Sequence, residues 1–216
     1  MSMEHYRAAQ KAGKKDLQTR TSQKLPVEMP ALDTILEHVD ISGEVPLGLV
    51  DIPTELIVGT KTCGRASSFA PNFMPILGES TEFAAKWSSL CDAHLKEGIR
   101  DPIVAYEYMN HYYIQEGNKR VSVLKYFDAI SIPGYVTRII PAREDTPESR
   151  IYYEFLDFYN ATNINYLFFS KEGSYAHLAF HLATADMNAG AWTTGFCSAP
   201  ATIALPTLSR NLAVTS

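Results

Sequence analysis

The sequence predicts an α+β fold, in which a small mixed β-sheet is flanked by helices, with an N-terminal helical arm and extra C-terminal helices. Two observations lead to this prediction. Short apolar runs bounded by glycine and proline recur through the middle of the chain, as in residues 132–140. Segments with the spacing of an amphipathic helix stand between and after them, as in residues 79–98. Strands and helices mixed in this way indicate one sheet with helices packed on it.

The first 45 residues are expected to form the helical arm. Residues 1–23 read as a polar helix with few apolar positions and with cations spread around it. A solvated arm, or one exchanged between the two chains of a homodimer, is the default interpretation of such a helix. Residues 31–41 form a short amphipathic segment after two prolines, Pro26 and Pro30.

The central domain is predicted over residues 46–141. A strand at 47–52 leads through a short helical step to a second apolar run at 56–58. Residues 61–78 are an irregular loop that contains Arg65 and is long enough to be functional. The helix at 79–98 ends at Gly98. Two short runs around Asn110 and His111 predict a hairpin, followed by a helix at 118–128 and a strand at 132–140.

Residues 142–187 are predicted to be a C-terminal helical extension. Its first helix starts at Thr146 and Pro147, with proline at the first helical position. A strand-like run at 165–169 and a helix at 173–187 follow. Residues 188–216 carry a single charged side chain, Arg210, and no periodicity, which fits a truncation scar, a read-through tail or a poorly packed extension. No function is assigned to this unpatterned tail.

Composition describes a globular chain without a general affinity for polyanions. The chain is 46% hydrophobic and 20% charged, and its net charge is -5, so an anion site must come from a local arrangement. Three widely spaced cysteines without a CxxC pair argue against a disulfide framework or a zinc knuckle. Neither a signal peptide nor an apolar run of roughly 20 residues is present, so a cytoplasmic protein with no membrane partner is expected.

The turn at residues 116–120 carries the strongest chemical signal. Gly117 ends an apolar strand and lets the backbone come close to a ligand. The following residues open a helix, whose free amides and dipole attract anions, and Lys119 and Arg120 add positive charge. Glu116 could hold a metal ion, accept a ligand hydroxyl or act as a base. The alternative interpretation is an ordinary strand-to-helix turn with exposed cations.

The order of segments over residues 46–141 resembles the N-terminal domain of the ParB/sulfiredoxin superfamily, also called the ParB-like nuclease domain. The matching segments are "VDIPTELIVG", the loop with Arg65, "EFAAKWSSLCDAHLKEGI", "RDPIVAYEYMNHYYIQEGNKRVSVLKYF" and "SIPGYVTRII". The resemblance implies a nucleotide phosphate site formed by Gly117, Asn118, Lys119 and Arg120, with Arg65 as a further basic contact. It places Glu116 where some relatives carry a catalytic or metal-binding acid. The opening "MSMEHYRAAQKAGKK" is similar to the start of larger bacterial proteins in which this domain precedes a sensor module.

The sequence departs from the superfamily pattern in two places, and each departure argues against one of the superfamily's functions. Sulfiredoxins have a nucleophilic cysteine at the position of Asn118, and an amide cannot replace a thiolate in that attack, so this chain is not expected to be a sulfiredoxin proper. The basic helix-turn-helix region of partition proteins is not evident after Ile140. DNA is therefore a disfavoured partner.

The leading hypothesis is a regulatory domain of ParB-like type that binds a nucleoside triphosphate, with magnesium as a candidate companion ion, or another phosphorylated small molecule. A small-molecule kinase or nucleotide hydrolase that uses Glu116 is one alternative, and a DNA-binding or partition-type module is another. No metal site of the protein's own is predicted. His177 and His181 have the i, i+4 spacing of two ligands, but no third ligand is evident, so a helix-face pair is expected.

Overall fold

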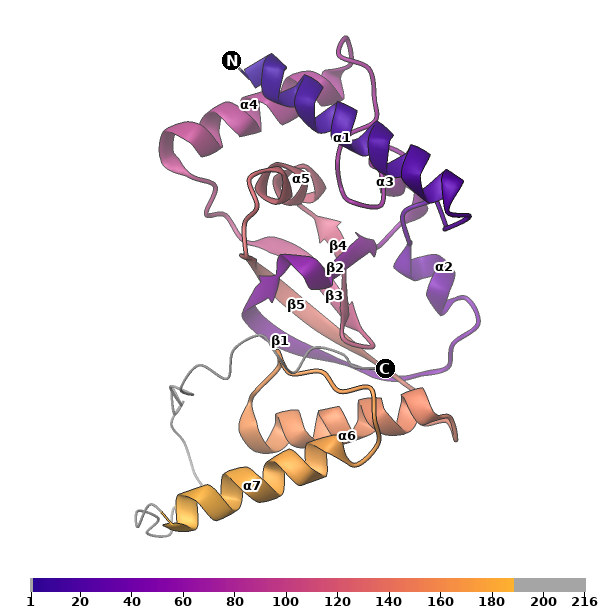
Figure 1. Ribbon diagram of the computed structural model, residues 1–216, viewed down its shortest axis with the longest axis vertical. Coiled ribbons are helices and arrows are strands. Elements are labelled where there is room, and N and C mark those ends of the chain that lie inside the picture. Colours follow the sequence, from indigo (N-terminus) through magenta and orange to yellow (C-terminus); the bar gives the residue numbers. More distant parts are fainter. Residues whose placement is uncertain (1, 189–216) are drawn as a thin grey trace. The chain divides into compact units, whose positions relative to one another are not determined.

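The computed structural model describes residues 2–188 and divides into two compact units (Figure 1). The first unit ends at Ala142 and the second begins at Arg143. Apart from Asn188, the predicted unpatterned tail lies outside the described residues. Within the described part of the chain, no helix combines the length and the apolar character that crossing a bilayer requires.

A five-stranded mixed sheet is the framework of the first unit, which confirms the α+β prediction. Its strands are β1 (Ile41–Pro53), β2 (Ile57–Thr60), β3 (Ile103–Tyr108), β4 (His111–Glu116) and β5 (Ser131–Pro141). Their order across the sheet is β1-β5-β3-β4-β2. The pairs β1–β5 and β3–β4 are antiparallel, whereas β3–β5 and β2–β4 are parallel. The predicted hairpin is β3–β4, with positive φ at both turn residues, Met109 and Asn110.

β1 is longer than the strand predicted at 47–52, because it begins at Ile41 and pairs with β5 along its length. The pairing shifts register between Pro46 and Gly48. Proline has no amide hydrogen for the ladder, and such a shift accommodates it at a sheet edge. Most of the strand is exposed, so its first half lacks the apolar alternation by which a strand is recognised.

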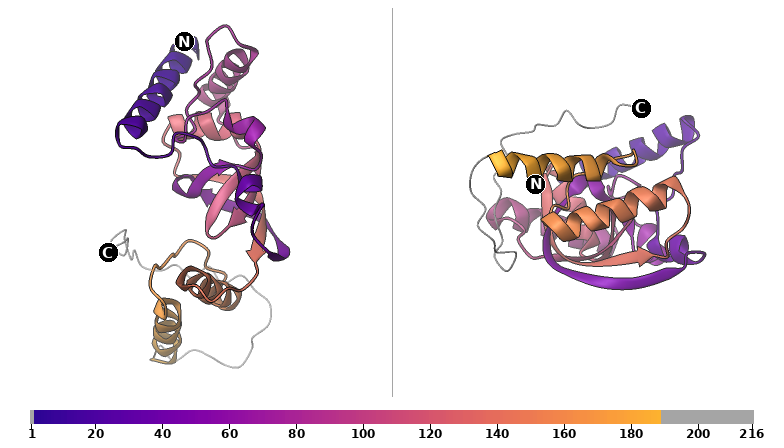
Figure 2. Two further views of the ribbon diagram at one scale, coloured as in Figure 1. Left: turned by 90° about the vertical axis from the view of Figure 1, so that its right-hand side faces the viewer. Right: turned by 90° about the horizontal axis from the view of Figure 1, so that it is seen from below.

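Helices surround this sheet in the first unit. They are α1 (Ser2–Ser22), α2 (Leu32–Leu36), the 3-10 helix η1 (Thr54–Leu56), α3 (Cys63–Ala66), α4 (Glu82–Glu97) and α5 (Asn118–Tyr126). α4 begins after Thr81, whose Oγ1 accepts a hydrogen bond from Ala84 N at 3.2 Å. It ends at Gly98 with φ 78°, as predicted. α5 lies between α4 and the sheet (Figure 2).

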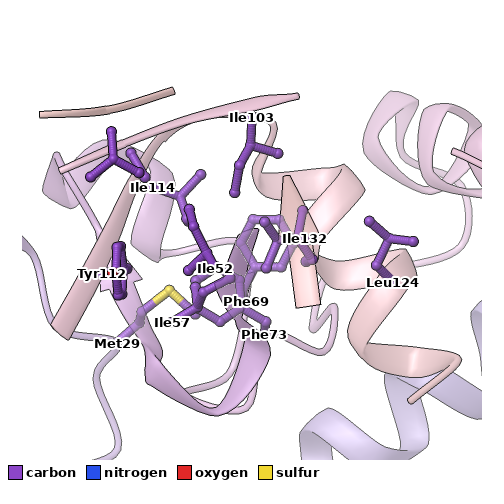
Figure 3. Packing of buried hydrophobic residues seen from close by; sticks show 13 residues of the cluster. Met29, Ile52, Ile57, Phe69, Phe73, Ile103, Tyr112, Ile114, Leu124 and Ile132 are labelled. Carbon is purple, nitrogen blue, oxygen red and sulfur yellow. The ribbon is translucent and has the colours of Figure 1, made fainter. Parts of the chain in front are cut away.

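The largest hydrophobic cluster joins the sheet to α5. Side chains of Ile52, Ile103 and Ile132, from β1, β3 and β5, belong to this cluster with Leu124 of α5 and Phe73 (Figure 3). All five are buried. Burying each such side chain stabilises the fold by about 1.5–3 kcal/mol relative to leaving it exposed. This packing fixes where α5 begins, and so positions the site described below.

α1 packs against α4 of its own chain (Figures 1 and 2). Tyr6 is fully buried, its ring lies edge-on to Trp87 with centroids 5.5 Å apart, and its hydroxyl donates to Leu77 O at 2.8 Å. The buried stripe is narrow, with Ala9 next and Gly13 close to backbone atoms of residues 74 and 75. The helix is thus part of the first unit, and the expectation of a solvated arm is wrong.

The second unit contains α6 (Pro147–Thr162) and α7 (Ser174–Asn188). α6 begins as predicted, because Thr146 Oγ1 accepts a hydrogen bond from Ser149 N at 3.2 Å. Phe155 and Phe158 of α6 pack on Tyr175 of α7, with ring centroids 5.8 and 5.5 Å apart. These aromatic side chains therefore form a small core.

The strand predicted at residues 165–169 does not form. The hydroxyl of Tyr175 accepts a hydrogen bond from Phe169 N at 3.2 Å and donates one to Leu167 O at 3.1 Å. Backbone polar groups must find partners when buried, and here a side chain supplies what a neighbouring strand would have supplied.

Candidate functional site

The candidate site begins where β4 ends and α5 starts. Gly117 is the N-terminal cap of α5 and has φ 95°, in the left-handed region that residues with a Cβ rarely adopt. A Cβ at this position would also lie 2.7 Å from Ile103 Cγ2. The sequence suggested that the glycine serves the approach of a ligand. In the structure, the turn needs glycine for its own backbone conformation and for packing against the core.

The N-terminus of α5 leaves three backbone amides available. Its first helical hydrogen bond runs from Val121 N to Gly117 O at 2.9 Å. Within residues 2–188, no oxygen accepts a hydrogen bond from the amides of residues 118–120, and Gly117 offers no capping side chain. Unpaired amides at this end of a helix carry partial positive charge, to which the helix dipole adds. Such a terminus is suited to binding an anion.

The predicted site residues line one pocket of about 310 Å³. Its walls come from residues 115–120, from α3 with the loop after it, and from α4. The lining residues are Arg65, Ser68, Phe69, Phe83, Leu90, Gln115, Glu116, Gly117, Asn118, Lys119 and Arg120. The volume lies at the lower end of the range for small-molecule sites, about 300–1,000 Å³. The turn and Arg65, which are far apart in the sequence, are therefore brought together.

Positive charge is concentrated at this pocket. The pKa of Lys119 is lowered, first by burial and then by the nearby cations Lys86 and Arg65, with Glu82 acting in the opposite direction. Lys119 Nζ lies 4.8 Å from the centroid of the Phe83 ring. An anion bound beside Lys119 would offset the repulsion from the neighbouring cations that lowers its pKa. The electrostatics and the free amides thus favour the same kind of ligand.

Arg120 makes contacts that the sequence did not predict. Its Nη1 donates to Asp101 O at 2.9 Å and to Pro102 O at 2.7 Å. The guanidinium therefore ties the first turn of α5 to the segment that leads into β3. Arginine has five N–H donors, and these two bonds use only those of Nη1.

Asn118 contributes a buried polar atom without a partner. The residue is 8% exposed, and no described residue forms a hydrogen bond with its Oδ1. Leaving such an atom unpaired costs about 1–3 kcal/mol. Because Asn118 lines the pocket, a donor group of a ligand or a water molecule could supply the missing bond.

Glu116 is exposed and lines the same pocket, so its carboxylate is accessible to a ligand there. The apolar wall, formed by Phe69, Phe83 and Leu90, was not predicted as part of a site. Phe83 belongs to the apolar stripe of the helix predicted at 79–98, and such a stripe normally packs in a core. The pattern of the helix alone therefore could not distinguish pocket from core at this position.

Comparisons with known proteins give one similarity in fold. No protein-family model matches the chain, and no curated protein matches it. Among solved structures, a crystal structure of sulfiredoxin from Arabidopsis thaliana matches with a TM-score of 0.29 and 20% identity, over 41% of this chain and 82% of that one. Neither an activity nor a ligand follows from a likeness at this level.

Proposed function

We propose that the chain is a nucleotide-binding regulatory domain of ParB-like type, which takes up a nucleoside triphosphate at the N-terminus of α5. The observation that carries this proposal is the set of free amides at residues 118–120, which belongs to a pocket that Arg65 and Lys119 also line. Three amide donors and two cations suit a polyanion better than a neutral ligand. The resemblance of residues 46–141 to the superfamily supports the same ligand class.

The two sides of the pocket suit the two ends of a nucleotide. The phosphates would lie over the amides after Gly117 and near Lys119. The base and ribose would lie toward Phe69, Phe83 and Leu90, which offer an apolar surface. Aromatic rings stack with any base, so this wall alone does not select one. Asn118 Oδ1 would accept a hydrogen bond from a ligand hydroxyl or from a water molecule.

A route from the pocket to the rest of the first unit supports a regulatory role. Phe83 and Leu90 of α4 line the pocket, and Trp87 of the same helix packs edge-on against Tyr6 of α1. The Tyr6 hydroxyl is bonded to Leu77 O, in the segment between the pocket loop and α4. A ligand that orders α4 would therefore also favour the docked position of α1. Such coupling requires only that the ligand bind one arrangement more tightly than another.

Glu116 favours a second candidate function, a small-molecule kinase or nucleotide hydrolase. Its exposed carboxylate lines the pocket, where it could hold a magnesium ion or accept a proton from a substrate. Phosphate release or transfer that is lost in Glu116→Gln, with nucleotide binding retained, would favour the enzyme. Binding without turnover would favour the regulatory domain.

Isothermal titration with CTP, ATP and GTP, each with and without magnesium, tests the proposal. Lys119→Ala should weaken binding by about 1.5–3 kcal/mol, or about 10- to 150-fold, the range for a charged hydrogen bond. Lys96→Ala is the matched control, because Lys96 is an exposed lysine of α4 outside the pocket. Absence of binding at millimolar nucleotide would refute the proposal, as would equal losses in the two variants.

A further inference from the structure

Two histidines on α7 form a compact nitrogen pair away from the pocket. His177 and His181 are one helical turn apart, and both are exposed. Their Nε2 atoms are 3.2 Å apart, and their ring centroids are 4.4 Å apart with planes inclined at 70°. The backbone alone brings i and i+4 side chains to the same helix face. The rotamers also bring the same ring nitrogen, Nε2, of both side chains close together.

The separation of these nitrogens matches the span of two ligands on one metal ion. A zinc–imidazole bond is about 2.0–2.1 Å long, and octahedral or tetrahedral angles then place two neighbouring nitrogens about 2.8–3.4 Å apart. The Nε2 atoms of His177 and His181 fall within this range. Both rings could therefore bind one ion with little change of rotamer. The same 3.2 Å contact is a hydrogen bond when one ring carries Nε2–H and the other does not, and a bound metal ion would replace that proton.

We propose that His177 and His181 bind a divalent first-row transition-metal ion, such as Zn²⁺, Ni²⁺ or Cu²⁺. Imidazole nitrogen is a good ligand for all three ions. Among the described residues, no group of three or more His, Cys, Asp or Glu side chains is placed to hold a metal ion, so this part of the chain supplies two ligands. Water completes the coordination shell, since both side chains are exposed. The i, i+4 spacing predicted a plain helix-face pair, whereas the distance between the two nitrogens matches a chelate.

Metal titration of the full chain without an affinity tag tests this proposal. Zn²⁺ and Ni²⁺ are each titrated calorimetrically in a Cys63→Ser background, because the exposed thiol of Cys63 is a competing ligand. One ion should bind per chain. His177→Ala and His181→Ala should each weaken binding by about a hundredfold, since the second ligand acts at a high effective concentration.

His38→Ala is the matched control, because His38 is exposed and lies in the first unit. It should bind Zn²⁺ and Ni²⁺ as the parent does. Far-UV circular dichroism should show that all three alanine variants keep the helical content of the parent. Unchanged affinity in His177→Ala and His181→Ala, or no binding at millimolar metal, would overturn the proposal. An equal loss in His38→Ala would do the same.

Discussion

The guanidinium of Arg120 donates to the carbonyl oxygen of Pro102 at 2.7 Å and thereby ties the start of α5 to the start of β3. A second bond from the same Nη1 reaches Asp101 O. Arg120 therefore supports the wall of the pocket that carries the free backbone amides of residues 118–120. The residue contributes to the fold as well as to the positive charge of the pocket.

Replacing Arg120 by alanine should reduce stability even without a ligand. Loss of the two bonds from a charged donor should lower the free energy of unfolding by about 1.5–3 kcal/mol. Urea denaturation of Arg120→Ala measures this loss, with Arg100→Ala as control because Arg100 is an exposed arginine outside the pocket. If Arg120→Ala unfolds at the same urea concentration as the parent, the supporting role is wrong.

Gly117→Ala should destabilise the fold through two effects. The alanine must adopt φ 95°, and its Cβ would lie 2.7 Å from Ile103 Cγ2. Backbone strain of this kind costs about 1–3 kcal/mol, and the close contact adds to it. Thermal unfolding is the measurement, and Gly64→Ala is a suitable control because a Cβ there meets no atom within 4 Å. Equal melting temperatures for the two variants would contradict the conformation of the turn.

Trp87→Phe should loosen the contact between α4 and α5. Trp87 Nε1 donates to Ser122 Oγ at 2.8 Å, and both residues are buried. Phenylalanine keeps an aromatic ring beside Tyr6 but leaves the Ser122 hydroxyl without this donor, which should cost about 1–3 kcal/mol. In the double variant with Ser122→Ala, part of the loss should be recovered. A double variant no more stable than Trp87→Phe would count against an energetic role of the bond.

Lys125 should make stability depend on pH in the alkaline range. Its Nζ donates to Ile57 O at 2.8 Å and lies 5.1 Å from the Phe73 ring centroid, and burial lowers its pKa from 10.5 to about 8. The folded pKa is below the unfolded one, so the unfolded state binds more protons between these values. Stability therefore rises as pH rises from about 8 toward 10, by at most about 3 kcal/mol.

Urea denaturation at about pH 7.5 and pH 9.5 measures this change. The range ends below pH 10 because burial raises the pKa of Tyr113 to about 12, and a raised tyrosine pKa removes stability as pH increases further. Lys125→Met should remove most of the rise, and the remainder should come from Lys119, whose pKa burial also lowers. The same slope in Lys125→Met would show that another group causes it.

The sequence could predict those parts of the site that are formed by residues adjacent in the chain. An apolar strand, a glycine and a segment with helical spacing identified the turn at Gly117 and the helix that follows. The partners of Arg120 could not be foreseen, because residues 101 and 102 reach it only through the packing of β3 beside β4. Phe83 was recognised as apolar, but only the position of the loop after α3 decides that it borders a pocket.

The difference between local pattern and packing also explains why two predictions about the fold were wrong. α1 shows few apolar residues because its contact with α4 uses a narrow stripe of Tyr6, Ala9 and Gly13, so its sequence resembles a solvated helix. Residues 165–169 have strand-like composition, yet the Tyr175 hydroxyl satisfies their backbone. In both cases a contact between packed elements decided the outcome, and the pattern of apolar residues within one segment does not reveal such a contact.

The most direct test of the central claim is the ¹H–¹⁵N spectrum of the chain during titration with CTP, ATP and GTP. The amide resonances of Asn118, Lys119 and Arg120 should move together and saturate with at least one of these nucleotides, and inorganic tripolyphosphate should shift the same three signals. If these amides stay in place at millimolar concentrations of all four compounds, or if the shifts fall elsewhere in the chain, the anion site at the start of α5 is contradicted.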